Sequence, residues 1–301
     1  MAVSTKHVLS QLPALRTLGG VALSALMPGR SGKAVKTPGP WIEAELSPRP
    51  AALVRDYIRH VGGDPAWYRG RIPAHFFSQW GFPLAARALS GLPYPLTRVV
   101  NAGCRIEQHA PLLGGERLFA RARLQSIDED ERRALVTTRV ETGTRDVPFS
   151  VIAEMRVFIP LPSRGEAKQK SGGSKAKPTV PADAREIAFM RLSKDAGLDF
   201  AKLTGDFNPI HWIRPYARAS GFRSTILHGF ATLARAIEAL NRARFAGDPA
   251  RLKIVDARFT RPLVLPARAG VYVNDAGGIW VGDAPAGGAY LEGHYETEAS
   301  R

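Results

Sequence analysis

The chain twice shows the pattern of one long helix followed by a series of short strands. Residues 75–89 and 229–241 are predicted helices, and in the second the apolar residues recur at helical spacing and form one stripe. Alternating segments predict strands at 99–107, 116–127, 134–141 and 149–159 in the first half, and at 253–259, 269–274, 278–281 and 289–296 in the second. Each half therefore predicts a strand, a long helix and an antiparallel meander, which is an α+β arrangement.

The two halves resemble each other and are separated by a segment of different composition. Residues 57–64 (YIRHVGGD) are similar to residues 200–206 (FAKLTGD), and a predicted helix follows each. The segment of different composition is residues 161–183. It is rich in Gly, Ser, Lys and Pro and has few apolar side chains, which is typical of a flexible linker. We divide the chain into an N-terminal extension (1–40), an N-terminal half (41–160), a flexible basic linker (161–184) and a C-terminal half (185–301).

Net charge changes this picture little, although the 301 residues carry a formal charge of +15. Residues 1–40 contain five basic residues and no acidic one, and residues 163–182 contain five basic residues and one acidic one. The excess positive charge is therefore concentrated outside the two halves. No aromatic stacking surface or nucleic-acid motif accompanies it, so we expect no nucleic-acid partner.

The N-terminus and the single cysteine bear on where the protein works. Residues 8–27 are apolar, but Pro13, Arg16 and a Gly-Gly pair interrupt them, so neither a transmembrane span nor a signal peptide is favoured. We expect a helix packed on the body or on a partner subunit, and attachment to a membrane surface is the alternative. Cys104 is the only cysteine and cannot form an internal disulfide, which favours a reducing compartment and predicts a cytoplasmic protein.

The chemically informative segment is residues 203–211, LTGDFNPIH. Asn208-Pro209 is a turn signal, because the proline keeps the residue before it out of the helical region. Such a turn can bring Asp206 and His211 to one water molecule as an acid/base pair, since a carboxylate and an imidazole exchange protons near neutral pH. Taken alone, the turn also fits a capped turn with an incidental surface histidine.

The segments that follow favour the acid/base pair. Residues 218–229 (RASGFRSTILHG) lead into the second long helix, and residues 257–262 (ARFTRP) come later. Together with GDFNPIH, they resemble the signature of the MaoC-like, R-specific enoyl-CoA hydratases over about residues 185–298. The resemblance implies a double hotdog, in which two antiparallel sheets each wrap on a long central helix. Residues 263–269 depart from the family, which often has Pro-Gly and an acidic residue there. The resemblance therefore does not predict the geometry of this loop.

The resemblance also assigns catalytic roles. Asp206 and His211 match the pair that holds the water added across a trans-2-enoyl thioester, which gives an R-3-hydroxyacyl thioester. Gly229 matches the residue whose main-chain N–H polarises the thioester carbonyl. This role agrees with the free N–H groups and the partial positive charge at a helix N-terminus. The implied enzyme is a hydro-lyase that needs no metal or other cofactor, and its substrate is carried on CoA or on acyl carrier protein.

Other residues near the motif are given lesser roles. Asn208, Gly205 and Ser224 are predicted to support the site, with Asn208 fixing the turn. His228 is predicted to be structural, because its neighbour Gly229 supplies the useful amide.

The N-terminal half is predicted to be a degenerate hotdog without a working site. Gly63-Asp64 aligns with Gly205-Asp206, but no Asn-Pro turn with a histidine follows. Asp64 is therefore predicted to be a turn residue and His75 a helix-start residue, in a half that widens the acyl tunnel. A non-catalytic acyl-thioester-binding protein and a hotdog thioesterase remain alternatives, and we expect a monomeric pseudo-dimer or a homodimer.

Overall fold

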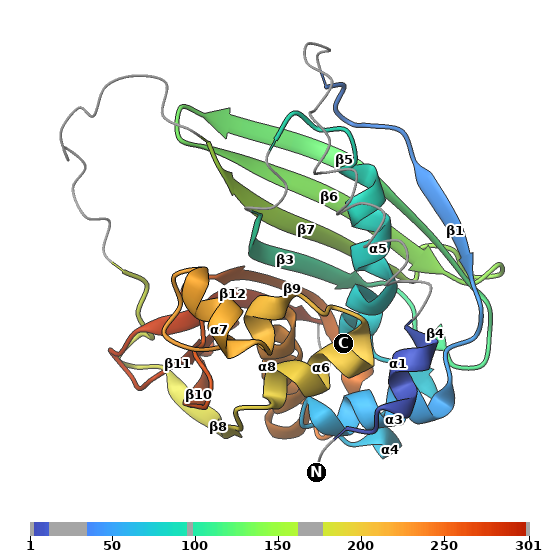
Figure 1. The fold of residues 1–301 in the computed structure, drawn as a ribbon. Helices are drawn as coiled ribbons and strands as arrows, with labels where there is room; N and C mark the ends of the chain where they lie inside the picture. Colours follow the sequence, from blue (N-terminus) through green and yellow to red (C-terminus); the bar gives the residue numbers. More distant parts are fainter. Residues whose placement is uncertain (1–2, 12–34, 95–98, 162–176, 299–301) are drawn as a thin grey trace.

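The computed structural model describes residues 3–11, 35–94, 99–161 and 177–298, coloured along the chain in Figure 1. The first part contains α1 (Lys6–Ser10), β1 (Ile42–Leu46), α3 (Ala51–His60), α4 (Pro65–Tyr68), β2 (Arg71–Ile72), η1 (Ala74–Phe77), α5 (Ser78–Ala88), β3 (Val100–Gln108), β4 (Leu112–Leu113), β5 (Leu118–Asp130), β6 (Arg133–Gly143) and β7 (Val151–Pro160). The second contains β8 (Arg185–Leu192), α6 (Ala196–Thr204), η3 (Pro209–His211), α7 (Arg214–Ala219), α8 (Gly229–Ala243), η4 (Pro249–Arg251), β9 (Leu252–Phe259), β10 (Ala267–Val273), β11 (Gly278–Gly282) and β12 (Ala289–Thr297).

The strands of both halves form one antiparallel sheet of ten strands in the order β1-β5-β6-β7-β3-β9-β12-β11-β10-β8. Each half contributes five of them, and the halves meet where β3 pairs with β9 from Gly103–Arg258 to Glu107–Ile254. Main-chain hydrogen bonds therefore join the two hotdogs at this seam. The two sheets of the double hotdog are joined into one, as expected for two hotdogs in one chain.

The two long helices cover one face of this sheet. In Figure 1, α5 crosses the strands of the first half, and α8 lies over those of the second. The helices meet at Phe230 of α8, whose ring centroid lies 5.7 Å from that of Phe77 and 4.9 Å from that of Phe82. On α8 the predicted stripe (Phe230, Leu233, Ala234, Ile237 and Leu240) is buried, as an amphipathic helix over a sheet requires.

The predicted elements correspond closely to those observed, with two differences. The first long helix begins with the 3-10 turn η1 and contains Pro83, whereas the prediction gave one uninterrupted helix. The predicted linker ends in ordered structure: Val180 is fully buried, and its N–H donates to Gly287 O at 2.9 Å. Residues 162–176 of that linker lie outside the described residues.

The described start of the predicted N-terminal extension packs on both halves. His7 contacts the carboxylate of Asp56 on α3 at 2.7 Å, and Gln11 is fully buried. The side-chain amide of Gln11 donates to Leu203 O of α6 at 2.9 Å and accepts from Gln79 of α5 at 2.8 Å. A helix was expected over residues 8–27; α1 begins at Lys6 and ends at Ser10, and residues 12–34 lie outside the described part, so the remainder stays a prediction.

Gln11→Ala is expected to destabilise the protein by about 1–3 kcal/mol, because it leaves a buried helix-end carbonyl and Gln79 without their partners. Urea unfolding followed by circular dichroism measures this change. Leu9→Ala is the control, since Leu9 lies on the same helix and is 71% exposed. Equal midpoints for the Gln11→Ala variant and the wild type would show that the contact adds nothing to stability.

Candidate active site

The turn that carries Asp206 forms because three local signals agree. Helix α6 ends at Gly205, which has φ 83°, a conformation that glycine adopts without steric cost. Asn208 then caps η3 by accepting from Ile210 N at 3.3 Å, and Pro209 occupies the first position of η3. Asp206 Oδ1 accepts from Asn208 N at 3.3 Å, which holds the carboxylate beside the turn.

His211 ends this turn with its side chain held in one tautomer. The ring is 8% exposed, and its Nδ1 lies 2.8 Å from Ile226 O. A carbonyl oxygen can only accept, so Nδ1 carries the hydrogen and Nε2 carries a lone pair. No described residue is a hydrogen-bond partner of Nε2, so it is available to a ligand in the adjoining cavity.

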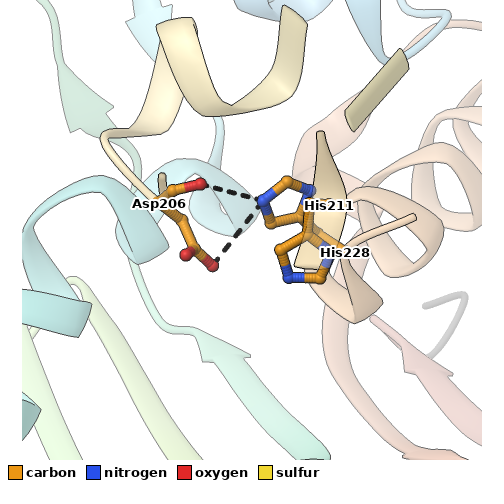
Figure 2. Close-up of side chains that lie close together, drawn as sticks. All are labelled: Asp206, His211 and His228. Atoms are coloured by element: carbon orange, nitrogen blue, oxygen red, sulfur yellow. Dashed lines mark hydrogen bonds and ion pairs between the residues drawn. The ribbon is translucent and has the colours of Figure 1, made fainter. Parts of the chain in front are cut away.

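His228 lies against both members of the predicted pair (Figure 2). Its ring stacks on that of His211, with centroids 3.6 Å apart and planes inclined by 24°. Its Nε2 lies 3.0 Å from the main-chain oxygen of Asp206 and 3.8 Å from Oδ2 of the same residue. The sequence prediction treated His228 as structural and missed this arrangement, because nothing in the local pattern places it there.

Gly229 follows His228 as the first residue of α8 and lines the same cavity. No acceptor for its N–H exists among the described residues, as expected for the first residue of a helix. A Cβ atom at this position would lie 2.7 Å from the ring of Phe259, so only glycine fits here. The N–H group, the Asp206 turn and the two histidines thus border one space.

That space is a cavity of about 670 Å³ shared by the two halves. The C-terminal half contributes the residues just described, together with Asn208, Phe222 and Phe259. The N-terminal half contributes apolar side chains from α5 and from the inner face of its sheet, among them Phe82, Ala85, Ala86, Leu89, Met155 and Val157. The small residues Ala85 and Ala86 on α5 leave room between this helix and its sheet.

The remaining predicted residues lie apart from the cavity. Ser224 does not line it and makes no side-chain hydrogen bond to any described residue, so the structure gives no basis for its supporting role. Asp64 caps α4 by accepting from Ala66 N at 2.9 Å, in agreement with its prediction as a turn residue. His75 lies in η1 at the helix start, as predicted, and its Nε2 is 3.1 Å from the buried carboxylate of Glu238.

Burial governs the charge state of the two histidines in the cavity. It lowers the pKa of His211 below its usual value of 6.5, and the negative charge of Asp206 opposes that shift. Burial likewise lowers the pKa of His228 to about 3, with a further lowering from His211. Both rings are therefore neutral near pH 7.

Asp206, His211 and His228 offer ligand atoms within 4.8 Å of one another, which raises the question of a metal. However, Nδ1 of His211 and Nε2 of His228 each donate to a main-chain oxygen. Neither of these two nitrogens can bind a metal while it donates that hydrogen bond, so the hydrogen bonds of the two histidines oppose a metal centre here.

A family model described as "MaoC like domain" matches residues 174–284. The match lies almost wholly within the predicted C-terminal half. The curated relatives include 3-hydroxyacyl-thioester dehydratase X of Mycobacterium tuberculosis, 28% identical over 71% of this chain and 73% of its own length. Another is the peroxisomal enoyl-CoA hydratase 2 of Arabidopsis thaliana, 41% identical over 19% of each chain.

Solved structures extend the similarity beyond the matched residues to both halves. HtdX of Mycobacterium tuberculosis superimposes with a TM-score of 0.67 over 86% of this chain and 100% of its own, at 21% identity. A conserved hypothetical protein from the same organism, described as having a double hotdog fold, gives a TM-score of 0.57 over 87% of this chain and 96% of its own, at 12% identity. The predicted double-hotdog fold is confirmed.

Proposed function

We propose that this protein is a hydro-lyase that adds water to trans-2-enoyl thioesters, or removes it from R-3-hydroxyacyl thioesters. The observation that carries the proposal is the arrangement of Asp206 and neutral His211 beside the free N–H of Gly229 in one cavity. The match to the MaoC-like family model and relatives named as dehydratases and hydratases support the same reaction class.

Asp206 and His211 divide the work on the water molecule. The water donates one O–H to the Asp206 carboxylate and the other to Nε2 of His211, and its oxygen attacks C3 of the enoyl group. His211 takes the proton from the attacking water as the C2–C3 π electrons move toward the thioester. The imidazolium then gives this proton to C2. Both hydrogens of the water end in the product, and the site returns to its starting protonation.

Gly229 stabilises the charge that develops during this step. The thioester oxygen becomes enolate-like when C3 accepts the water oxygen, and a donor that already points at it lowers the barrier. The N–H of Gly229 is such a donor, and it lies at the positive end of α8. Because water addition leaves the oxidation state of the substrate unchanged overall, the reaction needs no redox cofactor.

The cavity and the rest of the chain suit an acyl thioester substrate. The apolar walls from α5, β3 and β7 can hold the acyl tail, so the N-terminal half supplies binding and the C-terminal half chemistry. The acyl group is carried on CoA or on acyl carrier protein. No helix within the described ranges has both the length and the apolar character of a membrane span, and the free, buried Cys104 suits the reducing cytoplasm.

The test is turnover of trans-2-enoyl-CoA from four carbons upward, beside one enoyl-acyl-carrier-protein substrate. Loss of the conjugated enoyl absorbance reports hydration, and chiral analysis of the product reports its R configuration. A thiol reagent run in parallel detects free CoA, which a thioesterase would release. Free thiol without hydration would replace the proposal by the thioesterase alternative, and binding without turnover would favour the non-catalytic one.

The acidic limb of the pH–rate profile for hydration is expected below pH 6.5. The active form of His211 is neutral, and burial lowers its pKa, so activity is lost only when the pH falls through that lowered pKa. Asp206 raises the pKa of His211. In the Asp206→Asn variant, the acidic limb of the pH–rate profile is therefore expected to shift to lower pH, measured on the activity that remains. A limb at or above pH 6.5 in the wild type would contradict the role given to His211.

A further inference from the structure

His228 is tied to each of the three groups that the proposed mechanism uses. Its Nε2 contacts the main-chain oxygen of Asp206, its ring stacks on His211, and its carbonyl carbon is bonded to the nitrogen of Gly229. The other ring contact comes from Phe200 of α6, at a centroid distance of 4.9 Å. The side chain is 2% exposed, so its position is fixed by these contacts.

We propose that His228 is a positioning residue, which sets the separation and orientation of Asp206 and His211 relative to Gly229. This inference rests on the proposed function. It assigns no proton transfer to His228: the ring supports one face of the His211 imidazole, and the Nε2 hydrogen bond holds the main chain of the turn on which the carboxylate is carried.

The hydrogen-bonding pattern restricts His228 to one tautomer. The main-chain oxygen of Asp206 can only accept, so Nε2 of His228 carries the hydrogen. Its Nδ1 is buried and has no hydrogen-bond partner among the described residues. The two stacked rings therefore hold opposite tautomers, with the hydrogen on Nδ1 of His211 and on Nε2 of His228.

Neutrality of His228 is a further requirement of this arrangement. A charged imidazolium stacked at 3.6 Å would oppose protonation of His211, which the proposed mechanism needs when the water proton is transferred. Phe200 also packs on the ring, with centroids 4.9 Å apart, and only 2% of His228 is exposed, so the ring lies in apolar surroundings that favour its neutral form. The ring thus gives support to His211 without opposing its charge.

Two substitutions separate the contacts of His228. His228→Phe keeps a flat ring for stacking but removes the donor to Asp206 O, and His228→Gln keeps an N–H donor but removes the stack. We expect His228→Phe to lower kcat for enoyl-CoA hydration about 10- to 100-fold with KM within about twofold, as for a misplaced catalytic group. His228→Gln should recover part of the loss. His60→Phe is the matched control, because His60 packs on Phe200 as well, at 6.5 Å, and should keep wild-type kcat.

A double substitution distinguishes positioning from general structural support. If His228 acts through Asp206, His228→Phe should cost less than about threefold when Asp206 is already Asn, because effects of coupled residues are not additive. A full 10- to 100-fold loss in that background, or wild-type kcat for His228→Phe alone, would overturn the proposal. Melting temperatures and circular dichroism check that each variant is folded.

The tautomers supply a test that does not depend on turnover. Nitrogen-15 spectra of the imidazole rings should show His211 protonated on Nδ1 and His228 on Nε2 at neutral pH. Hydrogen on Nδ1 of His228, or a charged His228 ring, would overturn the proposal even in an inactive protein. An absence of hydration by the wild type would count against the proposed function, and the spectra would still decide the arrangement of His228.

Discussion

Asp206→Asn is expected to lower kcat for hydration about 10²–10⁴-fold, the loss that follows removal of a general acid/base. The amide keeps the size of the side chain and can still accept from Asn208 N, so the turn should survive. The amide has no negative charge with which to hold the water or to stabilise a charged His211. His211→Ala should cost a similar factor, because it removes the ring nitrogen that takes the proton from the attacking water. Initial rates with a short enoyl-CoA measure both variants.

Asp64→Asn provides the matched control in the other half. The same chemical change falls on the aligned position, but Asp64 is exposed and only caps α4. Asparagine is as good a helix cap as aspartate, so stability and turnover should both remain at wild-type values. A large loss of short-chain activity in Asp64→Asn would mean that the N-terminal half contains a working site. Near-wild-type turnover in both Asp206→Asn and His211→Ala would refute the catalytic pair.

Ala85→Trp is expected to change which acyl chains are accepted. Ala85 lies on α5, is 4% exposed and lines the cavity, so an indole there fills the space that a long tail needs. We expect kcat/KM for long or branched enoyl-CoA substrates to fall about 10- to 200-fold, the range that one misfit in an apolar pocket produces. Four-carbon substrates should react at nearly wild-type rates, because they do not reach α5.

Arg87→Trp is the control for this substitution, since Arg87 is an exposed residue of the same helix that does not line the cavity. Short-chain turnover of Ala85→Trp serves as an internal check of folding. An unchanged chain-length profile in Ala85→Trp would show that the tail does not run between α5 and its sheet.

Much of the fold and the centre of the candidate site could be predicted from the sequence because their signals are local. Helix periodicity, strand alternation, the glycine at the end of α6 and Asn208-Pro209 all act within a few residues of where they stand. The seam could be expected only from the family resemblance, because pairing of β3 with β9 joins residues more than 140 positions apart.

The roles that the sequence did not predict depend on tertiary contacts. His228 faces Asp206 across 22 positions, and its stacking on His211 follows from how α8 meets η3. Gln11 reaches α6 across 192 positions, so a basic N-terminal segment gave no sign of it. Val180 packs with Tyr272 of β10 and Ala289 of β12 although its neighbours have the composition of a linker, and composition alone does not reveal such a tertiary contact.

Joining the two hotdogs through β3 and β9 within one polypeptide has an evolutionary consequence. In a dimer of identical chains, one gene encodes both central helices. A mutation that shortens a side chain on the helix beside the acyl tail therefore shortens the same side chain on the helix beside the acid/base turn. Here α5 has the small Ala85 and Ala86 at the cavity, whereas α8 keeps Leu233 and Ile237 packed on its own sheet. Natural selection can therefore alter tail preference through mutations in one half while the half that performs the chemistry keeps its sequence.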